Sequence, residues 1–161
     1  MSFSVPKKLQ TEINRTIKKY PEKRSASLML LHAVQEEFGY VSNEAIEWIA
    51  DKLELQPINV YELVTFYPMF RQAPAGKHVL KVCRTLSCAL GGAKTLHGHL
   101  CNKLGLDRNA HGLQTSKDGQ FSVEYVECLA SCGTAPVMMC DDDFFEGVSL
   151  EKADEILEAN Q

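Results

Sequence analysis

Four of the six cysteines in this chain form two close pairs, and this spacing constrains the fold more than any other feature of the sequence. The pairs are Cys83 with Cys88 and Cys128 with Cys132, which have four and three residues between their members. Four thiolates from two local pairs form the ligand set of a tetrahedral metal ion or of a [2Fe–2S] cluster. The pattern therefore predicts a metal centre assembled from two separate loops.

Each pair directly follows a segment in which apolar and polar residues alternate. These segments are His78–Val82 and Phe121–Glu127, and a helical pattern lies between them from about Ala89 to Leu104. The alternation predicts two strands, and a strand–helix–strand crossover makes such strands parallel. We therefore expect both cysteine loops at the same edge of one sheet, where the ligand sites of open α/β sheets form.

The residues around the cysteines help to distinguish an iron–sulfur cluster from zinc, disulfides and a dithiol redox site. Both loops are small and uncharged apart from Arg84, and backbone N–H groups in such loops stabilise the sulfurs of a cluster, which favours a cluster over zinc. Zinc accepts similar spacings and remains an alternative. Residues 1–19 are polar and lysine-rich, which predicts no secretory signal and makes two disulfides the least favoured alternative. The absence of a C-x-x-C motif argues against a dithiol redox enzyme.

The remaining sequence predicts an α+β protein of two domains. Residues 1–70 carry apolar stripes at helical spacing and predict a helical bundle. The expected helices cover about 4–20, 22–38, 42–53 and 57–67. Residues 71–76 predict a linker because they include Pro74 and Gly76, and residues 77–161 form the second domain. In that domain we expect two further strands, 136–140 and 144–148, around a hairpin turn, and a closing helix after Ser149.

Charge and motif content exclude several functions. The formal net charge is −4 and no long basic block occurs, which argues against a nucleic-acid partner. The longest stretch without Asp, Glu, Lys or Arg, residues 128–140, is shorter than the ~20 residues of a membrane-spanning helix, so we expect no direct membrane insertion. Neither a G-x-G-x-x-G motif after a strand nor a P-loop occurs, so we expect no NADH, flavin or substrate site within the chain.

Other chemistry-bearing residues are interpreted mainly as structural. Cys101 falls on the apolar side of its helix, whereas Cys140 ends a strand and is either structural or an alternative ligand. The three aspartates 141–143 predict a solvated hairpin turn rather than a cation site. His97 and His99 lie two residues apart and therefore on different helix faces, which argues against a shared metal.

Two interpretations concern the N-terminal half. His32 lies within an apolar helical pattern and is predicted to be a core histidine. The aromatic segment Thr65–Phe70 predicts core between the two domains, with a partner-facing surface as the alternative.

Three stretches of the sequence resemble the 24 kDa-type, or E, subunit of respiratory NADH:quinone oxidoreductase (complex I). They are residues 23–42, 64–70 (Val-Thr-Phe-Tyr-Pro-Met-Phe) and 127–136 (Glu-Cys-Leu-Ala-Ser-Cys-Gly-Thr-Ala-Pro). Cys83 and Cys88 match the first cysteine pair of that family. The resemblance covers both halves of the chain. The chain departs from the family pattern at Ala130, where the family usually has glycine, and at Cys140, where a polar residue is common.

The resemblance implies a fold, a cofactor and partners. It implies that the C-terminal half is a thioredoxin-like ferredoxin domain whose four cysteines hold one [2Fe–2S] cluster. These ligands are Cys83, Cys88, Cys128 and Cys132. A partner subunit would bind FMN and NADH, its flavin exchanging electrons with the cluster, and the large iron–sulfur subunit would be a second partner. The chain would then act enzymatically only as a subunit of NADH:quinone oxidoreductase, in the cytoplasm and peripheral to the inner membrane if bacterial.

Two alternatives to this function remain open. The equivalent small subunit of an NAD-linked hydrogenase or formate dehydrogenase is very similar to the complex I subunit. A zinc-stabilised scaffold without a redox role belongs to a different class of protein. A methyl group at Ala130 would crowd a tight cysteine loop if the φ angle there were positive.

Overall fold

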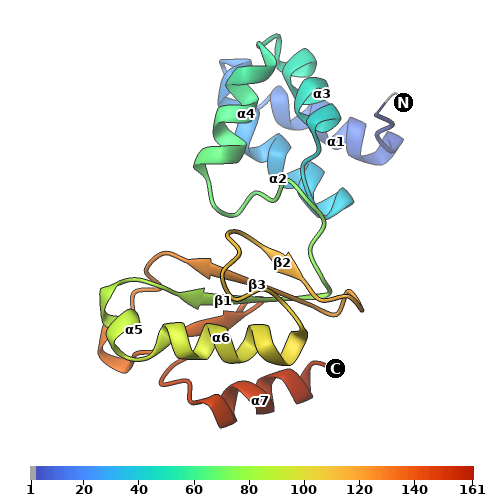
Figure 1. Ribbon diagram of the computed structural model, residues 1–161. Coiled ribbons are helices and arrows are strands. Elements are labelled where there is room, and N and C mark those ends of the chain that lie inside the picture. Colours follow the sequence, from blue (N-terminus) through green and yellow to red (C-terminus); the bar gives the residue numbers. More distant parts are fainter. Residues whose placement is uncertain (1–2) are drawn as a thin grey trace. The chain divides into compact units, whose positions relative to one another are not determined.

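A computed structural model describes residues 3–161, which divide into two compact units at Pro74 (Figure 1). The first unit is helical, and the second, which begins at Ala75, combines a sheet with helices. This confirms the predicted α+β class and the order of a helical bundle followed by an α/β domain. Within residues 3–161, the helices are all too short or too polar to cross a bilayer.

The first unit consists of four α-helices and one 3₁₀ helix around a single apolar core. They are α1 (Lys7–Ile17), η1 (Lys23–Ala26), α2 (Ser27–Phe38), α3 (Asn43–Leu53) and α4 (Pro57–Phe66). Local signals fix their ends: the Ser42 hydroxyl accepts a hydrogen bond from Ala45 N at the start of α3, and Pro57 opens α4. Gly39 ends α2 with a φ of 80°. The four predicted helices are confirmed, although the expected first turn of α2 is 3₁₀.

The second unit contains one mixed sheet with the strand order β2-β3-β1-β4-β5. Its strands are β1 (His78–Cys83), β2 (Gln114–Thr115), β3 (Phe121–Val126), β4 (Met138–Cys140) and β5 (Asp143–Phe145). β1 and β3 are parallel, with Cys83 opposite Val126, as the crossover predicted. All other neighbouring strands pair antiparallel.

Two helices, α6 (Ala93–Leu104) and α7 (Leu150–Ala159), lie on the same face of this sheet (Figure 1). They pack on each other, and the core beneath them is closed by Leu80, Leu100 and Met138, which are fully buried. The Ser149 hydroxyl caps α7 by accepting a hydrogen bond from Lys152 N at 3.2 Å. The helix expected after Ser149 is therefore confirmed.

Three details of this unit differ from the sequence prediction. Strand β2 lies between α6 and β3, in a stretch for which the sequence predicted no strand. The helix expected from about Ala89 is split into α5 (Leu86–Leu90) and α6, because Gly92 adopts a left-handed φ of 103° between them. The last strand ends at Phe145 instead of Val148. The Val148 N–H donates a hydrogen bond to Pro136 O, in the segment that follows the second cysteine pair.

Candidate metal centre

The parallel pairing of β1 and β3 brings the two cysteine pairs to one edge of the sheet. Cys83 is the last residue of β1, and Cys88 lies in α5, which follows at once. Cys128 comes two residues after β3 ends, and Cys132 begins the 3₁₀ helix η2 (Cys132–Thr134). The sequence prediction of a shared edge is therefore confirmed by the strand register.

The four sulfurs are arranged as two adjoining pairs. The Sγ atoms of Cys128 and Cys132 are 3.8 Å apart, and the thiols of Cys83 and Cys88 are hydrogen-bonded to each other. Across the pairs, Cys88 interacts electrostatically with Cys132, and Cys128 with Cys83. All four thiols are free in the structure. The first pair is buried, 1% and 2% exposed, whereas the second pair is exposed to solvent.

Hydrogen-bond donors from both loops converge on the sulfurs. Burial alone would raise the pKa of Cys83, but hydrogen bonds from Thr85, including its hydroxyl at 3.3 Å, and from the backbone of Leu129 lower it overall. The backbone N–H of Ala130 lies 3.3 Å from the Cys128 sulfur and, with the Thr85 hydroxyl, lowers the pKa of Cys128. Thr85 thus contacts one sulfur from each pair. Such contacts favour the thiolate form, which is the form that binds iron or zinc.

Cys88 has a different environment. Burial and the hydrogen bond to Cys83 raise its pKa, although a backbone hydrogen bond from Val137 opposes the shift. A metal bound here would have to displace the Cys88 proton.

Ala130 adopts a left-handed backbone with a φ of 63°. A positive φ is the condition under which a methyl group at this position is expected to crowd the cysteine loop. The left-handed region costs a residue with a side chain about 1–2 kcal/mol relative to glycine. The conformation nevertheless places the Ala130 N–H against the Cys128 sulfur.

A glycine and a carboxylate hold the second loop in place. A Cβ atom on Gly91 would lie 2.8 Å from the Ala135 Cβ, so only glycine allows the segment after α5 to approach the segment after η2 this closely. The Glu146 carboxylate accepts hydrogen bonds from the hydroxyls of Ser131 and Thr134, and these bonds lower its pKa. Neither contact could be predicted from the sequence, because the residues that form each contact are remote from each other in the chain.

The other candidate residues lie outside the four-cysteine group. Cys101 is fully buried on α6, as predicted, with its sulfur 3.7 Å from the Nδ1 atom of His97. In the sheet register, Cys140 on β4 lies opposite Leu80 on β1. Leu80 precedes Cys83 by three residues. Burial, followed by the nearby carboxylates of Asp141 and Asp143, raises the pKa of the Cys140 thiol to about 11.

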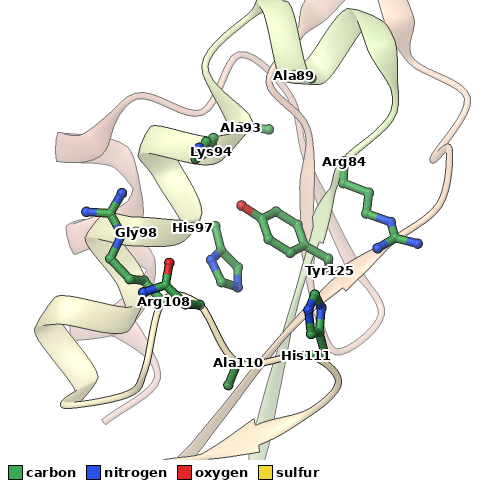
Figure 2. Close-up of a pocket in the computed structure, with 11 residues that line it drawn as sticks. Arg84, Ala89, Ala93, Lys94, His97, Gly98, Arg108, Ala110, His111 and Tyr125 are labelled. Atoms are coloured by element: carbon green, nitrogen blue, oxygen red, sulfur yellow. The ribbon is translucent and has the colours of Figure 1, made fainter.

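The two histidines of α6 face different surroundings, as expected. His97 is buried and its ring stacks on Tyr125, with centroids 3.8 Å apart, whereas His99 pairs with Asp154 at 2.7 Å. His97 and Tyr125 line a cavity of about 400 Å³ beside α6 (Figure 2). Arg84 and Arg108 also line it, but both guanidinium groups point away from the stacked rings (Figure 2).

One interpretation in the first unit needs correction. His32 is exposed rather than buried, and its ring lies 4.9 Å from that of Phe70. Within the segment Thr65–Phe70, Phe70 belongs to the core of the first unit, whereas Phe66 and Met69 lie on the surface of that unit. Helical periodicity alone does not reveal which side chains of a short helix remain exposed to solvent.

The fold and the four-cysteine centre define a thioredoxin-like α/β domain with a candidate metal site, and comparison with known proteins identifies its family. The family model for the thioredoxin-like [2Fe-2S] ferredoxin matches residues 13–161. The chain belongs to this family. The match confirms the resemblance on which the fold and cofactor expectations rested, and the family description implies a [2Fe–2S] cluster.

Curated relatives cover almost the whole chain, and each is an E-type subunit of NADH-quinone oxidoreductase. The chain is 35% identical to the relative numbered 2 in Rhizobium meliloti (strain 1021), over 94% of this chain and 88% of the relative. It is 36% identical to the relative in Aquifex aeolicus (strain VF5), over 96% and 94% of the two chains. It is 38% identical to the relative in Rickettsia bellii (strain RML369-C), over 98% and 93%. These relatives are subunits of an oxidoreductase complex.

Solved structures share the fold. An NAD⁺-reducing [NiFe]-hydrogenase in its air-oxidized state matches with a TM-score of 0.66 and 20% identity. The H₂-reduced state of such a hydrogenase matches with a TM-score of 0.64 and the same identity. In both cases the match covers 82% of this chain but only 22% of the hydrogenase chain. At this identity the likeness establishes the fold alone.

Proposed function

We propose that this chain is the electron-transfer subunit of the NADH-oxidising module of an NADH:quinone oxidoreductase. In this proposal the four cysteines at the sheet edge hold one [2Fe–2S] cluster, which exchanges electrons with FMN on a partner subunit that also binds NADH. The ligands are Cys83, Cys88, Cys128 and Cys132. The observation that carries the proposal is the convergence of these two pairs at the end of parallel strands, in a member of a [2Fe-2S] ferredoxin family.

The spacing of the sulfurs supports a binuclear cluster over a single zinc ion. A tetrahedral zinc with Zn–S bonds of about 2.3 Å brings all four sulfurs within roughly 4 Å of one another. In residues 3–161, a single group of three potential ligands has its ligand atoms within 4.8 Å of one another, and it contains none of these four cysteines. Four sulfurs that are not all gathered within this distance would fit a binuclear cluster better than a single ion.

The chain contributes ligands, burial and hydrogen bonds, whereas the cluster supplies one-electron transfer when bound. The N–H groups of Leu129, Ala130 and Val137 point at sulfurs of the site. Donors of this kind stabilise the added negative charge of the reduced state and raise the reduction potential. The Thr85 hydroxyl contributes to both pairs.

The exposed pair marks the side on which a partner would approach. Cys128 and Cys132 are open to solvent, while Cys83 and Cys88 are buried. Leu86 and Leu90 on α5, which flank Cys88, are 74% and 81% exposed. Large apolar side chains so exposed beside a redox centre suit a protein–protein contact. We therefore assign this surface to the FMN- and NADH-binding subunit, in a complex peripheral to the cytoplasmic face of a bacterial inner membrane.

Replacing single cysteines tests the ligand set. Cys→Ser substitution at each of the four positions should abolish the cluster or strongly change its visible and EPR spectra, because each removes an iron ligand. Cys101→Ser is the matched control, since Cys101 is a fully buried thiol outside the group, and it should retain the normal cluster. A normal cluster in any one of the four ligand variants would contradict the assignment.

A double variant tests the partner surface. Leu86→Asp with Leu90→Asp should keep the cluster but lose co-purification with the co-expressed flavin-binding subunit. Phe144→Asp, which changes a 45% exposed side chain on β5, serves as the control and should retain the partner. Partner recovery at the wild-type level with the double variant would contradict the docking assignment.

A second candidate function is supported by the fold of the NAD⁺-reducing hydrogenase. There the chain would form the equivalent small module of a hydrogenase that uses NAD. Identifying the subunits that co-purify from native cells distinguishes the two. Quinone-reducing complex subunits support the first function, and a nickel-containing large subunit supports the second.

A further inference from the structure

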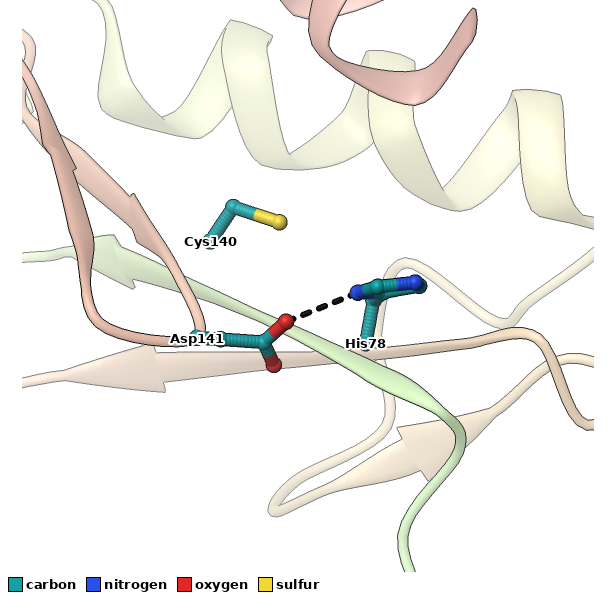
Figure 3. A group of neighbouring side chains, drawn as sticks. All are labelled: His78, Cys140 and Asp141. Atoms are coloured by element: carbon teal, nitrogen blue, oxygen red, sulfur yellow. Dashed lines mark hydrogen bonds and ion pairs between the residues drawn. The ribbon is translucent and has the colours of Figure 1, made fainter. Parts of the chain in front are cut away.

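A second cluster of potential metal ligands lies elsewhere on the sheet, at the start of β1 and the end of β4 (Figure 3). It consists of His78, Cys140 and Asp141, whose ligand atoms all lie within 4.8 Å of one another. An imidazole, a thiol and a carboxylate are the three side-chain types that bind zinc in proteins. We propose that these residues form a mononuclear site for a divalent transition metal of the zinc class, independent of the four-cysteine centre.

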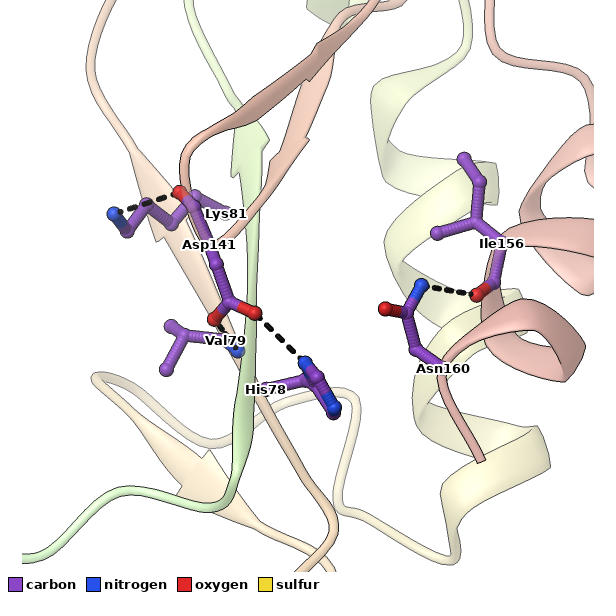
Figure 4. Close-up of polar contacts among 6 residues, drawn as sticks. All are labelled: His78, Val79, Lys81, Asp141, Ile156 and Asn160. Carbon is purple, nitrogen blue, oxygen red and sulfur yellow. Dashed lines mark hydrogen bonds and ion pairs between the residues drawn. The ribbon is translucent and has the colours of Figure 1, made fainter.

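Asp141 is held in place by the backbone of β1. Its N–H donates to Val79 O at 2.9 Å, and its Oδ1 atom accepts from Val79 N at 2.8 Å (Figure 4). Lys81 Nζ lies 3.4 Å from the Asp141 carbonyl oxygen. Asp141 makes these contacts from a left-handed backbone conformation, with a φ of 53°. The remaining oxygen, Oδ2, is therefore presented in a fixed direction, 2.7 Å from His78 Nδ1.

The third potential ligand approaches from the core. Cys140 is only 3% exposed, and its sulfur points into the space on the His78 side of the hairpin (Figure 3). The His78 and Asp141 side chains are 18% and 45% exposed, so one side of the site is open to solvent. An ion could enter from that side and keep a water molecule as its fourth ligand, as zinc sites with three protein ligands do.

Metal binding at this site balances in protons and charge. The ion would take the place of the proton between His78 Nδ1 and Asp141 Oδ2, and this single proton of the neutral imidazole would move to Nε2. The Cys140 thiol would release one proton to solvent. The thiolate and the carboxylate then neutralise the two positive charges of the ion. The groups that surround the site are Lys81, beside the Asp141 carbonyl, and Asp142 and Asp143 in the hairpin.

The same contacts also anchor the β4–β5 hairpin without any metal, so the test must separate anchoring from binding. Cys140→Ala removes one ligand and leaves the Asp141 contacts with Val79 and His78 in place. Cys101→Ala is the matched control, because Cys101 is also a buried free thiol. His78→Gln provides a second ligand variant at a partly exposed position, in case truncation of the buried Cys140 prevents folding.

The experiment is a zinc titration of the chain with its iron–sulfur content measured in the same sample. A competing chromophoric chelator gives the affinity, and zinc-edge X-ray absorption gives the ligands without interference from iron. Wild type and Cys101→Ala should bind one zinc per chain, with one sulfur and otherwise nitrogen and oxygen ligands. Cys140→Ala and His78→Gln should bind it at least tenfold more weakly, because losing even an outer-shell partner of a metal ligand typically costs about 10–100-fold in affinity.

Three results would overturn the proposal. They are no zinc binding by protein with an intact cluster, wild-type affinity in both ligand variants, and a coordination shell of four sulfurs. The last result would place zinc at the four cysteines and would contradict the proposed cluster as well. The iron and sulfide content distinguishes these failures, because it reports on the cluster whether or not the second site binds zinc.

Discussion

Arg84 and Glu127 form an ion pair that joins the two cysteine loops. The Nη2 and Nε atoms of Arg84 lie 2.6 and 3.1 Å from the same carboxylate oxygen, Oε1 of Glu127. Arg84 directly follows Cys83, and Glu127 directly precedes Cys128. Both side chains are more than half exposed, so the pair adds little to stability. Its position instead sets two opposite charges next to the proposed cluster.

We expect the two charges to shift the reduction potential of the cluster in opposite directions. Arg84→Gln removes a positive charge and should lower the potential, whereas Glu127→Gln should raise it. A unit charge about 10 Å away in water contributes ~0.4 kcal/mol, equivalent to ~20 mV for one electron. An EPR-monitored redox titration at low ionic strength measures both shifts.

The double variant is the control for this prediction. Removing both charges together should return the potential close to the wild-type value, and added salt should shrink each single shift. Shifts of the same sign in the two single variants would show that the loops have moved, which contradicts a purely electrostatic effect.

Ala130→Gly should stabilise the protein. The left-handed φ of 63° strains alanine but not glycine, so the substitution should raise the free energy of unfolding by about 1 kcal/mol. For a chain of this size that corresponds to a rise of roughly 2–4 °C in the midpoint of thermal unfolding, followed by circular dichroism. Ala89→Gly, in the exposed part of α5, should lower the midpoint because glycine weakens a helix. A lower midpoint for Ala130→Gly would contradict the strain argument.

Gly91→Ala should damage the site, whereas Gly133→Ala should not. The added Cβ at Gly91 would lie 2.8 Å from the Ala135 Cβ and 3.2 Å from the Ser87 carbonyl oxygen, so the two cysteine loops must separate. Overpacking of this kind costs about 1–3 kcal/mol. A Cβ at Gly133 meets no atom within 4 Å and the residue does not have a positive φ. The iron content and thermal midpoint of the two variants measure the difference, and equal damage would contradict the packing explanation.

Burial of His97 predicts a loss of stability at acidic pH. Burial lowers the pKa of His97 in the native state, while the unfolded chain takes up the proton near pH 6.5. The unfolded state therefore binds more protons below pH 6.5, and the stability falls as the pH decreases from 6.5 towards the lowered native value. His97→Phe keeps a ring against Tyr125 but does not titrate. Its thermal midpoint should fall less than that of the wild type between pH 7.5 and 5.5, and an equal fall would contradict this role.

The sequence predicted the arrangement that brings the cysteines together. Alternating segments before each pair, joined by a helical pattern, require parallel strands, and β1 and β3 are paired in this way. The positive φ at Ala130 was foreseen only as a condition, because backbone conformation within a loop depends on contacts that the sequence does not reveal.

What could not be predicted depends on residues distant in the chain. The Thr85 hydroxyl interacts with one sulfur of each pair, Cys83 and Cys128, only because the two cysteine loops lie side by side. Strand β2 is two residues long, and its pairing with β3 rather than its composition defines it. Likewise, the contact between His78 and Asp141 spans the antiparallel register of β1 and β4, so the aspartates alone indicated only a turn.

The measurement that tests the central claim most directly is the iron and acid-labile sulfide content of the anaerobically purified chain, with visible spectra before and after dithionite. The proposed function predicts two irons and two sulfides per chain and a visible absorption that bleaches on reduction. A colourless protein without labile sulfide, after expression with ample iron, would contradict it. The four cysteines would then form a structural site, and the proposed electron-transfer role would be wrong because it depends on the cluster.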